Sequence, residues 1–246
     1  MAQFTMKIAG CVAGVTSLFE STPAYFRNYL TEEAPQVQFS VTQDDLAFEK
    51  DFLYREALEE GFRVRNFPDP FLERAAIQRK FAEYLFDADV LLLHGSTVAL
   101  DGQAYLFTAK CGTGKSTHTR LWREVFGSRA VMVNDDKPFL RIRPEGVLAS
   151  GSPWSGKHGL DSNITVPLAG ICILERGPEN RIRPMAPAEA LPMLLWQSCP
   201  PLAPEKQPAF TSLVETLAHT APLWHMECTK NPDAARLAWE TMHKKT

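Results

Sequence analysis

The sequence has little that would mark a membrane, secreted or nucleic-acid-binding protein. No apolar segment approaches the roughly 20 residues that a bilayer-spanning helix needs. The first residues contain no basic stretch followed by a long apolar run, so we expect no signal peptide. The net charge is −3, from 26 Lys and Arg against 29 Asp and Glu, which leaves no basic surface large enough for nucleic acid. These absences predict a cytoplasmic protein that binds neither membranes nor nucleic acids.

Paired cysteines and repeats are also missing. The five Cys form an odd count, with no Cys-x-x-Cys pair and no Cys/His spacing that suits zinc, which favours reduced side chains in the cytoplasm. We find no internal repeat. The remaining composition is that of an ordinary globular protein, with 45% apolar residues, 15 Phe and 5 Trp to build a sizeable core. A length of 246 residues suits one elaborate domain, or a core domain with a smaller appendage.

The pattern of apolar residues indicates a small region followed by a larger core. Residues 1–87 alternate strand-like and helix-like segments, with strands expected at 6–15 and 37–42 and a helix that begins at Asp69-Pro70. We predict that these residues form a small α+β region of unknown role. Residues 88–246 are predicted to form an α/β core with a mixed sheet and C-terminal helices.

Strands dominate the first part of the predicted core, and helices dominate its end. Asp101-Gly102 is a strong signal for a two-residue hairpin, and the second strand of that hairpin leads directly into a glycine-rich loop. Strands are predicted at 90–94, 97–100, 103–108, 130–133, 139–143, 147–149, 169–174 and 181–184, the last of them pairing with its predecessor. Helices are predicted at 117–126, 187–198, 208–220 and 233–243.

The glycine-rich loop resembles a phosphate loop. Gly114-Lys115-Ser116 fits the pattern of Gly, four residues, Gly-Lys and Ser or Thr, although Ala109 replaces the first Gly. Small residues let backbone N–H groups approach phosphates, and the following helix N-terminus favours anions. The residues predicted to bind nucleotide are Cys111, Gly112, Thr113, Gly114, Lys115, Ser116 and Thr117. Lys115 would reach the outer phosphates and Ser116 would bind Mg²⁺; the alternative is a strand-to-helix turn without a ligand.

Two further motifs carry candidate catalytic groups. Asp135 and Asp136 follow a predicted buried strand, and the carboxyl ends of such strands line the ligand crevice of open α/β sheets. Phosphoryl transfer needs one acidic group for Mg²⁺ and often a second to accept the acceptor's proton. We assign Mg²⁺ to Ser116 and Asp136 and leave open which of the two Asp is the base. The alternative for the acidic pair is an ordinary turn. His94 ends the apolar strand upstream of the loop, and the alternative for it is a structural role.

His94-Gly95, residues 109–117 and Asp135-Asp136, in this order, resemble the nucleotide-binding core of HPr kinase/phosphorylase, which is similar to that of ATP-dependent phosphoenolpyruvate carboxykinase. The short spacing between loop and acidic strand, and the hairpin just before the loop, also fit that family. The resemblance covers residues 89–174 best. It implies a P-loop kinase fold, with His94 near the transferred phosphate, a general base at Asp135 or Asp136, and Ser116 at Mg²⁺.

The chain departs from that family at two points. Its loop begins Ala109-Lys110-Cys111-Gly112 where the family has Gly-x-Ser-Gly, and the family's downstream Arg-Gly signature is not recognisable. Because that signature participates in HPr recognition and dephosphorylation, we expect an HPr-kinase-like protein that acts on another substrate. Related kinases in this group act on free serine or on small ribosomal peptides.

A polar, glycine-rich loop at 150–159 is a candidate for the acceptor side of the site. Lys157 could neutralise charge on the phosphoryl group, and Trp154 could cover a base or a small substrate. The alternative is a surface turn with one packed Trp. Arg176 is a further candidate for a phosphate contact. Three other Trp are expected to pack in the core, namely Trp196, Trp224 and Trp239.

Taken together, these patterns predict a kinase that uses ATP and Mg²⁺ to phosphorylate a hydroxyl of a small molecule, amino acid or peptide. The catalytic residues would be His94, Lys115, Asp135 and Asp136. Two alternatives stay open: a nucleotide-binding regulatory module without catalysis, and a carboxykinase-like phosphotransferase. The expected partners are the nucleotide and the acceptor, and a homo-oligomer is compatible with the sequence.

Overall fold

The computed structural model describes residues 1–59, 61, 63 and 65–243. The chain divides into two compact units, Met1–Tyr84 and Leu85–Thr246; the sequence places the division after residue 87. Over the described ranges, no helix is both long and apolar enough to cross a membrane.

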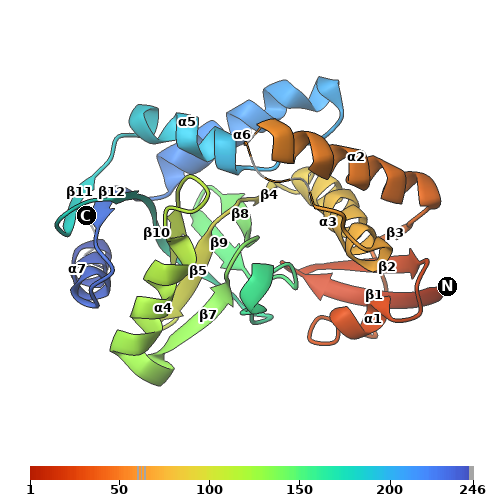
Figure 1. Cartoon of the computed structure of the whole chain (residues 1–246), viewed down its shortest axis with the longest axis horizontal. Helices are drawn as coiled ribbons and strands as arrows, with labels where there is room; N and C mark the ends of the chain where they lie inside the picture. Colours follow the sequence, from red (N-terminus) through yellow and green to blue (C-terminus); the bar gives the residue numbers. More distant parts are fainter. Residues whose placement is uncertain (60, 62, 64, 244–246) are drawn as a thin grey trace. The chain divides into compact units, whose positions relative to one another are not determined.

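The first unit holds a three-stranded sheet and helices (Figure 1). Its elements are β1 (Ala2–Ile8), β2 (Cys11–Ser17), α1 (Thr22–Tyr25), β3 (Val37–Ser40), α2 (Gln43–Glu59) and α3 (Asp69–Phe86). The single strand predicted at 6–15 is wrong, because the chain reverses at Ala9-Gly10, where both residues have positive φ. A positive φ is uncommon for Ala, so local sequence does not announce this turn. The buried Glu73 of α3 accepts hydrogen bonds from Phe19 N–H and Thr22 Oγ1 and ties α3 to the segment after β2.

The second unit is a mixed α/β fold around a curled nine-stranded sheet, which confirms the predicted class. Its strands are β4 (Val90–Leu92), β5 (Ser96–Leu100), β6 (Gln103–Thr108), β7 (Ala130–Asn134), β8 (Phe139–Arg143), β9 (Gly146–Ser150), β10 (Thr165–Arg176), β11 (Arg181–Pro184) and β12 (Leu223–Cys228). The order is β4-β8-β9-β10-β6-β5-β7, and β12 joins β10 while β11 joins β12. The predicted pairing of β11 with β10 is therefore wrong, because β12 lies between them.

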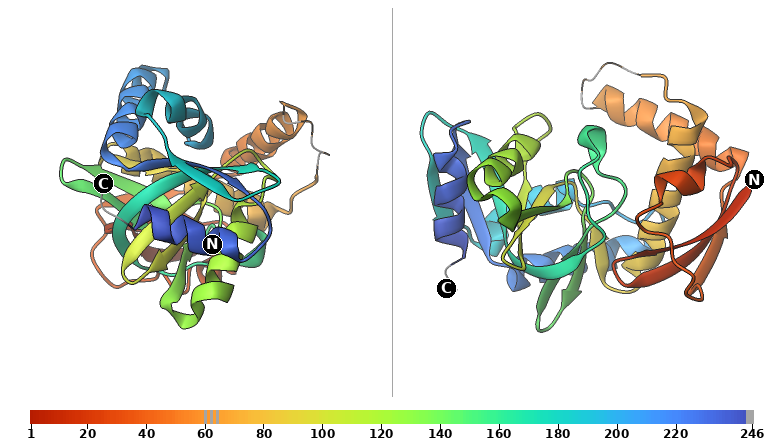
Figure 2. Two further views of the ribbon diagram at one scale, coloured as in Figure 1. Left: turned by 90° about the vertical axis from the view of Figure 1, so that its left-hand side faces the viewer. Right: turned by 90° about the horizontal axis from the view of Figure 1, so that it is seen from below.

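Helices cover both faces of this sheet (Figure 1, Figure 2). They are α4 (Lys115–Phe126), α5 (Pro187–Gln197), α6 (Gln207–Thr220) and α7 (Asp233–Met242). Leu194 of α5 and Leu217 of α6 pack with Leu106 and Ile171 in one apolar core. Trp122 of α4 and the Ala residues of α7 pack with β5, β6, β10 and β12 in a second core. The two cores fix the sheet between the helix pairs.

The strand directions bring several chain segments to one edge of the sheet. β6, β10 and β12 are mutually parallel, and β5 is antiparallel to both β6 and β7. β7 therefore runs in the same direction as β6. As a result, the carboxyl ends of β6, β7, β10 and β12 and the start of β5 meet at the same edge.

Candidate functional site

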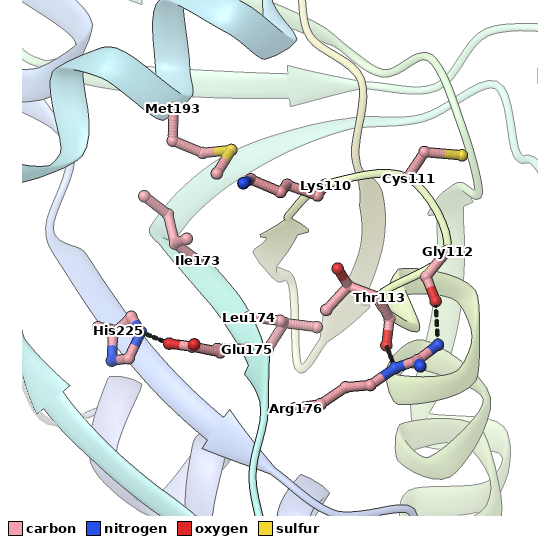
Figure 3. A pocket seen from close by; sticks show the side chains of 10 residues that line it. All are labelled: Lys110, Cys111, Gly112, Thr113, Ile173, Leu174, Glu175, Arg176, Met193 and His225. Atoms are coloured by element: carbon pink, nitrogen blue, oxygen red, sulfur yellow. Dashed lines mark hydrogen bonds and ion pairs between the residues drawn. The ribbon is translucent and has the colours of Figure 1, made fainter. Parts of the chain in front are cut away.

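The predicted phosphate loop connects β6 to α4 at this edge. Gly112 and Gly114 adopt φ values of 74° and 128°, which L side chains rarely adopt. The Arg176 guanidinium, at the end of β10, donates hydrogen bonds to the carbonyls of Gly112 and Thr113, the latter at 3.1 Å (Figure 3). These two hydrogen bonds connect the loop to the end of β10.

Lys115 and Ser116 begin α4 directly after the loop. The ammonium of the buried Lys115 donates a 3.1 Å hydrogen bond to the Ala109 carbonyl at the start of the loop. The Ser116 carbonyl accepts a 3.3 Å hydrogen bond from Thr119 Oγ1 within the first turn of α4. The positive end of the helix and the Lys115 charge lie together, which favours an anion at this place.

Asp135 is linked to the start of α4 by a chain of hydroxyl groups. The Ser96 hydroxyl, at the start of β5, donates a 2.6 Å hydrogen bond to Asp135 Oδ1. The same hydroxyl lies 2.7 Å from Thr119 Oγ1, and all three side chains are buried. This contact orients one carboxylate of the acidic pair toward the helix that carries Ser116.

Asp136 is instead paired with His94. His94 Nε2 lies 3.2 Å from Asp136 Oδ1, and both side chains remain partly exposed. Burial lowers the pKa of His94 below its ordinary value, and the positive charges of Lys137 and Lys115 lower it further against the opposing effect of Asp136. Burial would raise the pKa of Asp136, but the His94 hydrogen bond and Lys137 outweigh it, so that pKa lies below its ordinary value. Near pH 7 these directions give a neutral imidazole that donates to an ionised carboxylate.

Asn134 organises the acidic turn through its side-chain amide. Its Oδ1 accepts hydrogen bonds from the N–H groups of Asp136 at 2.7 Å and Lys137 at 2.5 Å. Its Nδ2 donates to the Ser152 carbonyl at 2.8 Å and to Ser152 Oγ at 3.0 Å. Asn134 therefore joins the acidic turn to the 150–159 loop. An Asn before Asp-Asp is an ordinary turn signal, so only the distant Ser152 contacts reveal this function.

The 150–159 loop lies against Asp136, but its two candidate residues differ in setting. Trp154 is 7% exposed and packs edge-on against Phe139, as in the packing alternative. Lys157 is exposed, in a short 3-10 helix at Gly156–His158. A Cβ at Gly156 would come 3.2 Å from the Cβ of Asp136, so the backbone beside Lys157 approaches the acidic turn closely.

A Mg²⁺ site is compatible with these residues once phosphate oxygens are included. Among the described side chains there is no group of three or more His, Cys, Asp or Glu that could hold a metal. Mg²⁺ commonly binds one or two carboxylates together with substrate phosphates and water, so it does not require such a group. The Ser116 hydroxyl at the start of α4 and the Asp135 carboxylate, which Ser96 links to Thr119 of α4, are oxygen donors of the kind that Mg²⁺ binds.

A cavity of about 710 Å³ lies on the other side of the phosphate loop (Figure 3). It is lined by Lys110, Cys111, Gly112, Thr113, Ile173, Leu174, Glu175, Arg176, Met193 and His225. Arg176 thus both donates hydrogen bonds to the loop and lines this cavity. Trp196 of α5, expected in the core, is 54% exposed, and the Lys110 ammonium lies 5.7 Å from its ring centroid. Except for Arg176 and the loop residues, these side chains belong to no motif that is recognisable in the sequence.

Comparisons with known proteins find similarity in structure but no match in sequence. No family model matches the chain, and no curated protein matches it in sequence. Among solved structures, the chain is similar to the HPr(Ser) kinase/phosphatase from Coxiella burnetii, with 12% sequence identity and a TM-score of 0.36. That match covers 61% of this chain and 97% of the other.

Proposed function

We propose that this protein is an ATP- and Mg²⁺-dependent kinase that transfers the γ-phosphoryl group to a hydroxyl of a small molecule, amino acid or peptide. The observation that carries the proposal is the convergence at one sheet edge of three separate segments. They are the loop before Lys115, the His94–Asp136 pair and the buried Ser96–Asp135 contact. A phosphate-binding loop beside an ionised carboxylate is the arrangement that phosphoryl transfer requires.

The two carboxylates take different roles in this proposal. Asp135 faces the α4 side through Ser96 and Thr119, so we assign it with Ser116 to Mg²⁺, in place of the sequence-based choice of Asp136. When bound, Mg²⁺ neutralises charge on the β- and γ-phosphate oxygens. Asp136 is left as the general base. Its carboxylate is ionised, partly exposed and fixed by His94.

The chemical step follows from these positions. The oxygen of the acceptor hydroxyl attacks the γ-phosphorus while Asp136 accepts the proton of that hydroxyl. The bond between the γ-phosphorus and the oxygen that bridges it to ADP breaks. Lys115 leaves the Ala109 carbonyl and binds the outer phosphate oxygens, where charge is greatest. His94 keeps the Asp136 carboxylate oriented. The close approach of Gly156 to Asp136 supports a role for the neighbouring Lys157 in neutralising charge on the phosphoryl group.

The proposal is tested with γ-labelled ATP, Mg²⁺ and pooled acceptors, comprising free amino acids, metabolites and short Ser- or Thr-containing peptides. We expect label to move to one acceptor class. Lys115→Ala should lower the rate by about 100-fold or more, because a charged transition-state contact is lost. Asp136→Asn should lower it by about 100-fold or more while largely retaining ATP affinity. Asp101→Asn, at an exposed hairpin turn, is the control and should be unchanged.

Each other outcome has a defined meaning. Tight ATP binding without transfer to any acceptor would favour the nucleotide-binding regulatory module. Full turnover in Asp136→Asn would remove that residue as the base. If neither ATP nor another nucleoside triphosphate binds, the kinase proposal is wrong.

A further inference from the structure

The cavity beside the phosphate loop is separate from the groups assigned to chemistry. In the sheet order, β6 and its loop lie between β10 and β12 on one side and β5 and β7 on the other. His94, Asp135 and Asp136 lie at β5 and β7, whereas Ile173, Glu175 and His225 come from β10 and β12. The loop therefore stands between two different sites at the same edge.

This order sets the direction of a nucleotide across the loop. The γ-phosphate must lie near Asp136 for transfer, and the phosphate chain must cross the loop at the N-terminus of α4. The rest of the molecule then extends toward β10 and β12. The cavity lies in that direction, with Gly112 and Thr113 of the loop in its wall.

The cavity walls have the chemistry of a nucleoside site. Ile173, Leu174 and Met193 give it an apolar surface, which suits a flat base. Figure 3 shows Lys110 extending toward Met193, while Cys111 points away from this side. The Glu175 carboxylate lies 3.2 Å from His225 Nε2, which orients it from the neighbouring strand. A volume of about 710 Å³ is within the usual range of small-ligand pockets.

We propose that this cavity binds the base and ribose of the nucleoside triphosphate. Glu175 accepts hydrogen bonds from the ribose hydroxyls, and the base packs against Ile173 and Met193. The inference rests on the proposed kinase function, but it concerns how the nucleotide is recognised, which the loop and catalytic residues do not determine. Inorganic tripolyphosphate, which has no nucleoside, separates the two.

The test measures binding of ATP and of inorganic tripolyphosphate, each with Mg²⁺, by calorimetry on the full chain. Wild type should bind ATP at least about tenfold more tightly than tripolyphosphate, because only ATP fills the cavity. Glu175→Gln should weaken ATP binding about tenfold and leave tripolyphosphate binding unchanged, because a charged hydrogen-bond acceptor is lost. Lys115→Ala should weaken the binding of both.

Glu179→Gln is a matched control. The side chains of Glu175 and Glu179 are both 65% exposed and each contacts a basic side chain, but the contact of Glu179 is with Arg181, and Glu179 does not line the cavity. Its substitution should leave both affinities unchanged. Fluorescence-detected unfolding of the two variants provides a check that their stabilities match.

The outcomes separate this inference from the function on which it rests. Equal affinities of wild type for ATP and tripolyphosphate would overturn the nucleoside site and leave the phosphate loop intact. Preference for ATP with no effect of Glu175→Gln would overturn the ribose contact. Binding of neither ligand would overturn the kinase proposal, and the nucleoside site with it.

Discussion

His118, in α4, is a buried titratable group with no catalytic assignment. The side chain is 2% exposed, and its ring centroid lies 4.4 Å from that of Phe107. Neither ring nitrogen has a hydrogen-bond partner among the described residues. Burial lowers the pKa of His118 from 6.5 to about 3, because the charged imidazolium would lose its hydration in an apolar core.

This lowered pKa predicts a pH-dependent stability. In the unfolded chain the His118 imidazole takes up a proton below pH 6.5, whereas in the folded chain it does so only near pH 3. The contribution of His118 to the free energy of unfolding is therefore fully present above pH 6.5 and declines as the pH falls. Between pH 7 and 5 the loss from this group is about 2 kcal/mol. Urea unfolding at both values should show a larger decrease for wild type than for His118→Leu. An equal decrease in both proteins would contradict the assignment.

At the scale of elements, the 150–159 loop offers a test of its contact with the acidic turn. Gly156 has φ +66°, and an added Cβ would press on Asp136 at 3.2 Å. Gly159 has a similar φ of +59° but no atom within 4 Å of an added Cβ, so Gly159→Ala is a matched control for backbone strain alone. We expect Gly156→Ala to lower turnover about tenfold or more relative to Gly159→Ala, because it displaces the proposed base.

The measurement is the turnover number of both variants at saturating ATP, alongside their thermal midpoints. Similar midpoints with different turnover numbers would support a positional effect at Asp136. The same turnover in both variants would show that the loop's close approach does not matter for catalysis.

Local patterns predicted the elements that depend on neighbouring residues. The Asp101-Gly102 turn joins β5 to β6 with φ values of 51° and 79°, and the strand–loop–helix around Lys115 forms as expected. The strand β12 was not predicted. Its six residues lie between two helices, and its partner β10 lies about fifty positions upstream, so no local period reports the pairing.

In the candidate site too, the sequence indicated the motifs formed by adjacent residues but not the contacts between distant segments. His94, Lys115 and Asp136 belong to motifs that can be recognised from adjacent residues. The bonds of Asn134 to Ser152 and of Ser96 to Asp135 join segments that are distant in the chain. His225 could not be placed because β12 itself was missed, and Glu175 has no distinctive motif beside it.

At the scale of the whole molecule, every residue assigned to the kinase site or to the cavity lies in the second unit. That unit contains two apolar cores of its own. We therefore expect residues 85–246, expressed alone, to fold and to bind Mg²⁺-ATP within about threefold of the full chain. Circular dichroism and calorimetry provide the two measurements. A folded fragment that has lost ATP binding would show that residues 1–84 contribute to the nucleotide site.

The position of β12 also affects how the protein is made. Strand β10 leaves the ribosome several seconds before β12 at ordinary rates of synthesis. During that interval β10 exposes the main-chain groups that β12 will pair with, and such an open edge invites pairing with other chains. The nascent protein therefore acquires His225, and with it the complete cavity, only when β12 pairs with β10.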